Sequence, residues 1–418
     1  MLKRFIILLL LVPAVGLQLK AQTNTSPYSI IGIGDMESKD YGKFFGMAST
    51  SIGMQSGSYV NLSNPASLTS LDPNMFNLDF NVRFRSSQYK YPGADTFTSS
   101  YSDAQFERFS LTFRPGKTWG VSFGLKPFSS SNYNMSELLN FGNGSNSNIL
   151  RTVNGSGGIN QVYLANAFKI NKNFSLGLTS SFLFGTLKRS TSYIYPQIDV
   201  NIQRNEYQIL KGFQFQGGLQ YTGKITNGLR QTIGLTISNP LTLKGRYEMQ
   251  YLNIDSALNP TIKDNQSFKI PLQFGAGYSL VIKDVFTIAA DYRYSDWSGA
   301  TLNYPNAYTT PTKRYSFGLQ YAPMKNIGGQ MREKFFIQGG VAYAEGYAVV
   351  DNKQLNDMSA TVGLGGNINR LINAYVGVEF GSRGKTADKQ IQEQYTQVSL
   401  GITLKEFWLN TRKLKKYN

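Results

Sequence analysis

Hydrophobic and polar residues alternate with a period of two along most of the chain beyond about residue 74. In the first such segment, Phe76, Leu78, Phe80, Val82 and Phe84 alternate with asparagine, aspartate and arginine. A period of two places successive side chains on opposite faces of a β-strand. The pattern therefore predicts strands with one apolar and one polar face, as in a soluble sandwich or a membrane barrel.

Fourteen segments share this alternation. The eighth is the longest, and its alternate residues from Phe268 to Ile282 are expected on one face. A tilted barrel strand crosses a membrane in about 9 to 11 residues, and most of the segments are that long. The segments begin near Phe76, Phe109, Trp119, Val162, Phe174, Phe213, Ile233, Phe268, Phe286, Tyr315, Phe335, Met358, Ile372 and Val398.

Short and long connections follow one another between the segments. Lys169–Asn173 and Lys283–Val285 are short, whereas Phe128–Gly158, Leu187–Asn205 and Asn239–Gln266 are long and polar. Bacterial barrels have short periplasmic turns and long extracellular loops. The even number of segments and this rhythm together predict an all-β, transmembrane antiparallel β-barrel of about 14 strands, located in the bacterial outer membrane.

The tryptophans are expected at the two membrane interfaces, where amphipathic indole rings settle. Trp119 opens a strand that rises from the periplasm, and Trp408 follows the last descending strand, so both are assigned to the inner interface. Trp297 follows a rising strand and is assigned to the outer interface.

The first 21 residues have the features of an export signal. Lys3 and Arg4 precede an apolar run from Phe5 to Val12, and Ala21 is a small residue before the expected cleavage point. The apolar run is too short for a membrane-spanning helix, so residues 1–21 are assigned to a cleaved signal peptide.

Three further segments complete the expected organisation. Residues 22–73 lack sustained alternation and are rich in Gly and Ser, which fits a packed hatch in the lumen or a disordered leader. Residues 74–404 form the barrel, and residues 405–418 form a basic periplasmic tail. Inward-facing glycines either relieve barrel curvature or admit a second backbone close to the wall. They are Gly120, Gly124, Gly275, Gly277, Gly318, Gly363 and Gly377.

Composition changes the picture in two ways. The mean hydropathy is −0.27, which does not argue against a barrel, because only alternate residues of a barrel strand face lipid. The formal net charge of +17 suits a partner with negative charge. For an exported protein, the expected partner is the set of anionic lipid headgroups rather than nucleic acid.

The chain has no histidine and no cysteine. Their absence removes Ser–His–Asp and Cys–His nucleophile systems and the common zinc sites. Gly32-Ile33-Gly34 is too short for a phosphate-binding loop. We therefore expect no enzyme activity, no metal site and no cofactor.

Four inward arginines are the candidate ligand-binding residues: Arg83, Arg85, Arg108 and Arg293. A guanidinium group binds a carboxylate through two parallel hydrogen bonds, so these residues suit the headgroup of an amphipathic ligand. The alternative is that they belong to paired polar groups in a wet or plugged lumen.

One stretch resembles a known family. Residues 45–69 contain Gly46 to Gly53, rich in small residues, followed by Asn64-Pro65-Ala66-Ser67-Leu68. This order is similar to the N-terminal hatch of FadL-type long-chain fatty acid transporters, although Ser67 stands where that family has glycine. The resemblance implies a hatch that contains Asn64, Pro65 and Ala66, and passive uptake of hydrophobic or amphipathic small molecules.

A second resemblance is to barrels of the Bacteroidetes phylum. Ser26 to Asp35 match their Ser-Pro-Tyr-Ser-x-x-Gly-x-Gly-Asp signature, and Phe407-Trp408 with Arg412–Tyr417 matches their aromatic-then-basic ending. Such relatives include transporters and a shuttle barrel of the type IX secretion system, so the fold alone leaves the function open.

Two functions follow from these resemblances. The first is FadL-like uptake of a hydrophobic, fatty-acid-like ligand. The second is a structural or shuttle subunit that binds other envelope proteins within a secretion or assembly machinery. An apolar cavity beside Asn64–Leu68 would favour uptake, and a filled lumen would favour the subunit.

Overall fold

The computed structural model describes residues 26–37, 39–97, 99–140, 148–195, 200–252, 261–300, 307–327, 330–350, 352–369 and 371–407. The proposed signal peptide, Trp408 and most of the basic tail lie outside these residues. Within them, no helix combines the length and the apolar character needed to span a membrane.

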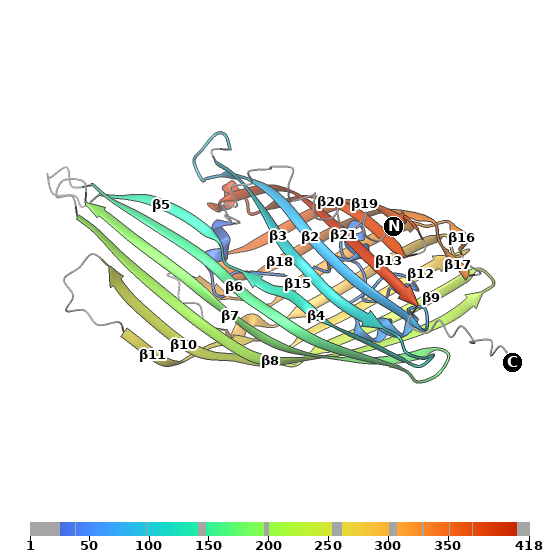
Figure 1. The fold of residues 1–418 in the computed structure, drawn as a ribbon. Coiled ribbons are helices and arrows are strands. Elements are labelled where there is room, and N and C mark those ends of the chain that lie inside the picture. Colours follow the sequence, from blue (N-terminus) through green and yellow to red (C-terminus); the bar gives the residue numbers. More distant parts are fainter. Residues whose placement is uncertain are drawn as a thin grey trace, which may run out of the picture.

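The chain forms a closed antiparallel barrel of 14 strands, and 73% of the structure is strand (Figure 1). Each strand pairs with the next, and the last pairs with the first from Met75 opposite Phe407 to Lys90 opposite Gln392. The barrel strands are β2 (Met75–Lys90), β3 (Ser99–Phe113), β4 (Trp119–Ser130), β6 (Asn148–Lys169), β7 (Phe174–Tyr195), β8 (Val200–Thr226), β9 (Leu229–Ser238), β12 (Gln273–Ile282), β13 (Phe286–Ser295), β15 (Thr312–Tyr321), β18 (Phe335–Val350), β19 (Lys353–Asn367), β20 (Ile372–Arg383) and β21 (Gln392–Phe407).

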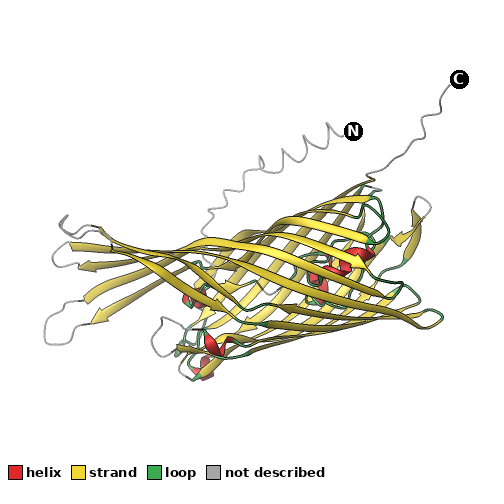
Figure 2. Ribbon diagram, turned by 90° about the horizontal axis from the view of Figure 1, so that it is seen from below, coloured by secondary structure: helices red, strands yellow, loops and turns green. Residues whose placement is uncertain are grey.

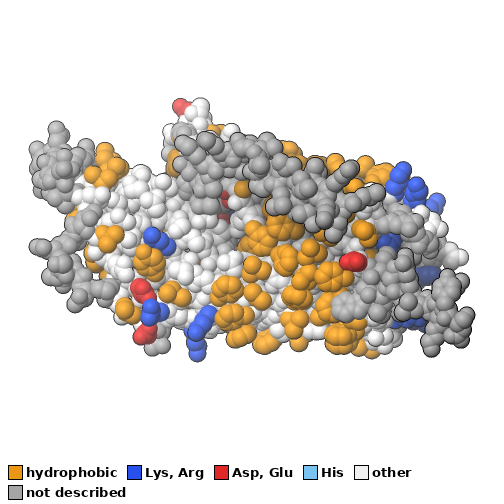
Figure 3. All heavy atoms as spheres, viewed as in Figure 1, with side chains coloured by type: hydrophobic (Ala, Val, Ile, Leu, Met, Phe, Trp, Pro, Cys, Tyr) orange, Lys and Arg blue, Asp and Glu red, His pale blue; other side chains and the backbone are white. Residues whose placement is uncertain are grey.

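The period-two pattern becomes a lipid face and a luminal face. On β15, Tyr315, Phe317 and Leu319 are exposed on the outside, whereas Arg314 and Ser316 between them are buried. Figure 3 shows the hydrophobic side chains gathered as a band over one half of the barrel, while the other half is mostly polar. The prediction of a transmembrane β-barrel is confirmed.

A polar sheet extends the barrel beyond the hydrophobic band, and we call it the outer extension (Figures 1 and 2). It consists of β5 (Tyr133–Asn140), β10 (Leu241–Leu252), β11 (Thr261–Ile270) and the adjoining halves of β6, β7 and β8. Parts of the segments predicted as long loops, Phe128–Gly158, Leu187–Asn205 and Asn239–Gln266, are therefore strands. The prediction of loops was wrong for these parts. No lipid lies outside these strands, so their outer face need not be apolar and the alternation that marks a strand in the sequence is lost.

The eighth predicted strand is two strands with a break at Pro271. Phe268 and Ile270 end β11 and are buried inside the barrel, whereas Leu272, just before β12, and Phe274 within it are exposed outside. Proline has no backbone N–H and cannot continue the hydrogen-bond ladder. The prediction of one face from Phe268 to Ile282 is therefore wrong at this break.

The outer mouth of the barrel holds an apolar group, which we call the mouth cluster. Trp297 belongs to it, is 3% exposed and packs against Phe268 and Tyr347. The expected interfacial position of Trp297 is wrong, because the short helix η5 (Trp297–Gly299) turns the indole into the mouth. Trp119 is 39% exposed at the start of β4, the end that is remote from the outer extension. The buried members of the mouth cluster are Ile33, Phe128, Ile159, Leu183, Leu187, Leu210, Leu243, Phe268, Ile270 and Trp297.

The outer extension should face the medium, because the long connections of bacterial barrels are extracellular. An impermeant thiol reagent added to intact cells should label Lys263→Cys on β11 and miss Lys172→Cys in a short turn. Both positions are exposed, and the chain has no native cysteine to interfere. Labelling of Lys172→Cys alone would reverse the orientation.

Candidate functional site

The hatch segment passes round the inside of the barrel wall, and its described part runs from Ser26 to Pro73. Three short helices lie in it, η2 (Pro27–Ile30), η3 (Lys43–Met47) and η4 (Pro65–Ser70). Phe45 contacts β20, Ile52 contacts β9 and β12, and Leu68 contacts β4. The hatch thus meets the strands in the reverse of their order in the sequence.

Glycines in the wall make this path possible. A Cβ at Gly363 of β19 would lie 2.8 Å from the Cα of Gly46, and a Cβ at Gly277 of β12 would lie 2.7 Å from the amide nitrogen of Gly53. Such distances leave no room for any side chain, so the hatch backbone lies directly on the wall. The wall glycines that contact the hatch in this way are Gly120, Gly177, Gly218, Gly234, Gly277, Gly318, Gly340, Gly363 and Gly377.

The small residues of the hatch lie against wall glycines on two strands. Gly46 lies against β19 and Gly53 against β12, whereas β4 meets Leu68 through Gly120. Gly124 lies beside Phe109 and Tyr163 instead of the hatch. Gly275 contacts the end of the Ile52 side chain.

Asn64, Pro65 and Ala66 form a turn that is lodged against β7, β8 and β9. Asn64 caps η4, since its Oδ1 accepts a hydrogen bond from the amide of Ala66 at 3.1 Å. Its Nδ2 donates to the carbonyl oxygens of Ile52 in the hatch and of Leu219 and Leu235 in the wall. One side chain therefore ties together the turn, the hatch and two strands, and proline fixes the backbone angle that follows.

Ion pairs between the hatch and the wall orient the hatch, which supplies the acid in some pairs and the base in others. Hatch Asp40 pairs with Arg108 of β3 at 2.7 Å, and hatch Glu37 pairs with Arg83 of β2 at 3.3 Å. The charges reverse at Lys39 of the hatch, which pairs with Glu379 of β20. Two further pairs join Asp35 to Arg383 and Lys43 to Glu333.

The carboxylate of Asp291 on β13 receives the hatch backbone directly. Its Oδ2 accepts hydrogen bonds from the amides of Ser51 at 2.7 Å and Ile52 at 3.0 Å. Arg314 of β15 donates to the carbonyl oxygen of Ala48 at 2.8 Å. Backbone groups that the irregular hatch cannot pair internally are thus bonded to wall side chains.

Burial disfavours the charged forms of the ionisable side chains in the hatch. Burial raises the pKa of the Asp35 carboxyl above its usual range, and Arg383 opposes this shift. Burial likewise lowers the pKa of the Lys43 ammonium, and Glu333 opposes it. In such pairs desolvation offsets most of the attraction, so the pairs contribute more to the position of the hatch than to net stability.

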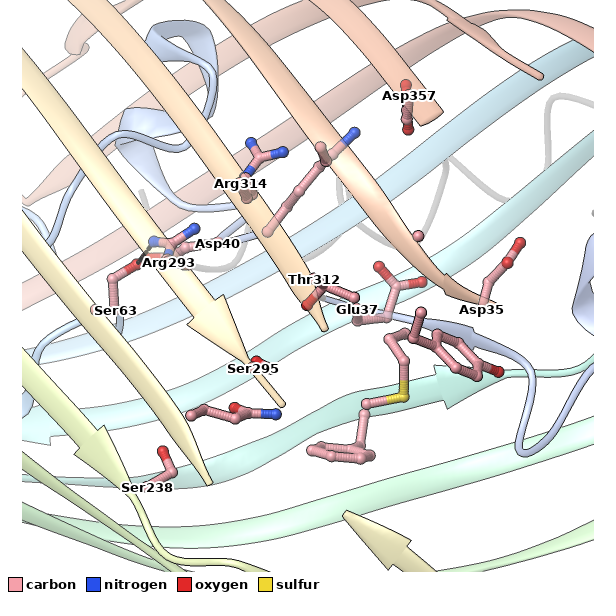
Figure 4. A pocket seen from close by; sticks show the side chains of 18 of the residues that line it. Asp35, Glu37, Asp40, Ser63, Ser238, Arg293, Ser295, Thr312, Arg314 and Asp357 are labelled. Atoms are coloured by element: carbon pink, nitrogen blue, oxygen red, sulfur yellow. Dashed lines mark hydrogen bonds between the residues drawn. The ribbon is translucent and has the colours of Figure 1, made fainter. Parts of the chain in front are cut away.

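A cavity of about 340 Å³ lies between the hatch and the wall. Figure 4 shows Asp35, Glu37 and Asp40 on the hatch side and Arg293 and Arg314 on the wall side. Most of the lining residues are polar, but polar and apolar atoms contribute about equally to the lining surface, which includes Phe128 and Trp297 of the mouth cluster. The cavity therefore offers charged groups and apolar surface side by side.

The four candidate arginines face this luminal region, and each has acidic neighbours. Arg83 also contacts Glu107, Arg85 pairs with Glu393 of β21 at 2.7 Å, and Arg108 also pairs with Asp79. Arg293 lies 3.6 Å from the carboxylate of Asp291. The structure brings them together around the hatch, with their charges directed to carboxylates of the protein.

Sequence reasoning missed the hatch residues in this network, and it missed Arg383 and Glu393 of the wall. Glu37, Asp40 and Lys39 lie in the hatch, where no periodicity assigns a direction to a side chain. Arg383 and Glu393 lie in strands, and their inward phase follows from the alternation of β20 and β21. The available signal for a charged lumen was a pair of acids, Asp35 at the end of the Ser26–Asp35 signature and Glu37 two residues later.

Comparisons with known proteins agree with this geometry. A family model described as BamG matches residues 1–417. The structure is similar to a Pseudomonas aeruginosa FadL homologue (TM-score 0.58, 12% identity, 90% of this chain and 100% of that chain). It is also similar to the Pseudomonas putida toluene transporter TodX (TM-score 0.58, 14% identity, 89% and 99%). A third similar structure is the CymD monoaromatic hydrocarbon channel (TM-score 0.53, 14% identity, 87% and 96%).

At such identities the solved structures show the shared fold, and they confirm the FadL-like outer-membrane barrel predicted from the sequence. These neighbours are described as transporters and channels and not as enzymes. No curated protein matches the chain significantly.

Adjacent glycines of β18 provide a test of the contact between hatch and wall. A Cβ at Gly340 would lie 2.5 Å from the carbonyl carbon of Met47, whereas a Cβ at Gly339 would point outward and meet nothing nearer than 3.9 Å. Gly340→Val should displace the hatch, at a cost of about 1–3 kcal/mol, and raise single-channel conductance in planar bilayers. Gly339→Val should behave as the unsubstituted protein. Equal conductance of the two variants would contradict the packed hatch.

Arg108→Ala should destabilise the protein by roughly 3–5 kcal/mol, because it leaves Asp40 and Asp79 buried without their cation. The control is Arg151→Ala, which removes an exposed pair with Glu137 and should cost about 0–1 kcal/mol. Urea unfolding in lipid vesicles measures both. Similar unfolding midpoints for the two variants would show that the luminal pairs do not hold the hatch.

Proposed function

The chain belongs to the BamG family, and on this premise we propose that it acts as a closed, non-enzymatic subunit of an outer-membrane protein complex. The family name supports a complex subunit, and the filled lumen supports it independently. In this role the barrel is a scaffold in the membrane, and its loops, its outer extension or its basic tail binds other envelope proteins.

The hatch bonded across the lumen, which leaves a cavity of only about 340 Å³ beside it, is the observation that carries the proposal. The space beside Asn64–Leu68, where an uptake barrel needs an apolar ligand site, is occupied by packed side chains. An apolar cluster there includes Val60, Leu62, Leu68 and Tyr163. The hatch is bonded to the wall on most sides, so a permeating molecule would have to break several buried ion pairs.

The outer extension supports a role in binding. Among the described strands, β5 pairs only with β6, and β11 pairs only with β10. An unpaired strand edge presents a row of free N–H and C=O groups and can accept a strand from another protein. The extension thus offers two such edges outside the membrane.

Uptake of a hydrophobic or fatty-acid-like ligand is the second candidate, and a gap in the wall favours it. The ladder between β3 and β4 ends at Phe109 opposite Leu125. Beyond that point β4 pairs with the hatch strand β1 (Asp35–Met36) instead. In this mechanism a ligand carboxylate replaces a paired acid of the hatch or wall on Arg83, Arg85, Arg108 or Arg293 and leaves sideways between β3 and β4.

The two functions predict opposite results in one pair of experiments. For the subunit, blue native electrophoresis of membranes in mild detergent should place the protein in a discrete larger assembly, and deleting its gene should leave cellular uptake of radiolabelled oleate and toluene unchanged. A monomer, together with a several-fold loss of uptake on deletion, would overturn the subunit and establish transport.

A further inference from the structure

Three lysines form a compact basic group on the outside of the barrel. Lys211 of β8 and Lys244 of β10 lie directly opposite each other across the strand pair. Lys269 of β11 pairs with Thr242, two residues before Lys244, which makes the two lysines diagonal neighbours. Directly opposite side chains have Cβ atoms about 5 Å apart and diagonal ones about 7–8 Å.

All three side chains point outward. Each lysine is flanked in its strand by a buried residue of the mouth cluster: Leu210 beside Lys211, Leu243 beside Lys244, and Phe268 beside Lys269. Successive residues of a strand face opposite sides, so the lysines lie on the outer surface, where they are exposed.

The group lies at the outer rim of the lipid-facing band. On β8 the outward residues next to Lys211 in the periplasmic direction are Phe213 and Phe215, which are 62% and 47% exposed. Leu272, just before β12, and Phe274 of β12 continue this apolar surface. Figure 3 shows basic side chains on the polar part of the molecule beside the margin of the hydrophobic band. Two strand residues span about 7 Å, so the lysines are at the level of lipid headgroups.

The inward side chains of β8 give a second indication of where this rim lies. At the level of the hatch, the inward side chains of β8 are polar, as Gln214 and Gln220 show. Leu210, two inward positions beyond Gln214, is apolar and belongs to the mouth cluster, and Gln208 beyond it is polar again. The mouth cluster thus meets β8 beside Lys211, where the outer surface changes from aromatic to basic.

These ammonium groups have no counterion recorded among the described residues. The nearby acid Glu248 is paired with Arg246, and Glu206 with Arg204. Like charges directly opposite each other in a sheet are destabilising. An external anion at this point would remove that repulsion.

We propose that Lys211, Lys244 and Lys269 bind the phosphate groups of a phosphorylated glycolipid headgroup of the outer leaflet, with its acyl chains along Phe213 and Phe215. The position at the rim, the unbalanced charge and the adjoining apolar surface together specify such a lipid. Lysine suits phosphate as a mobile point charge with three donors. The site is independent of whether the barrel is a subunit or a transporter.

The test is native mass spectrometry of the full-length protein in detergent micelles with bis-phosphorylated lipid A. Replacing Lys211, Lys244 and Lys269 together by Gln should weaken binding on the order of a hundredfold, and Lys244→Gln alone about fivefold, since each lysine near an anionic surface contributes on the order of tenfold or less. The triple replacement by Arg should retain binding and shows that the position tolerates substitution.

Matched controls separate the site from general charge. Replacing Lys224, Lys263 and Lys334 by Gln removes the same charge at exposed positions away from the rim and should leave binding unchanged. Dephosphorylated lipid A should bind weakly to every variant. Equal binding of the dephosphorylated lipid, equal binding by the triple Gln variant, or displacement of the lipid by millimolar inorganic phosphate would each overturn the proposal.

Discussion

The structure depends on direct contact between the hatch backbone and a barrel wall that lacks side chains at the contact. A barrel of 14 strands with ordinary inward side chains would hold the hatch near its axis. Instead, glycines on successive strands, such as Gly363, Gly340 and Gly277, let the hatch lie on the wall. Once it lies there, its unpaired amides and carbonyls reach wall groups such as Asp291 and Thr361. Glycine weakens a strand, and here the cost is offset by a bonded hatch.

This contact determines what the lumen can do. A hatch on the wall brings Asp35, Glu37 and Asp40 to arginines that a lumen without a hatch would leave to solvent or to a ligand. Because the charges of the two surfaces are complementary, moving the hatch exposes several buried ions at once. The arrangement therefore resists opening, which is the property expected of a scaffold and a barrier for a channel.

The sequence predicted the strands because lipid imposes a strict period of two on the outer face. It also predicted the hatch turn, because Asn64 and Pro65 have local conformational requirements. It could not predict the hatch partners of Arg83 and Arg108, since Glu37 and Asp40 lie in a segment without periodicity. Nor could it place Trp297, because a tryptophan can lie at a membrane interface or, as here, in a buried apolar cluster at the mouth of the barrel.

The strands of the outer extension were missed for a related reason. The same reason indicates where the outer membrane surface crosses the barrel. Within the bilayer the outward residues of β7 are apolar, as at Phe182 and Phe184, while polar residues such as Ser181 face inward. Farther out the outward residues of β7 become polar, as at Lys188, while Leu187 faces inward. The strand itself continues with unbroken pairing to β8 through this region. The apolar outer face therefore ends where the lipid ends, although the strand does not. This change of the outward residues is a marker of the outer membrane surface, and Lys211 of β8 lies at its margin, directly opposite Phe184.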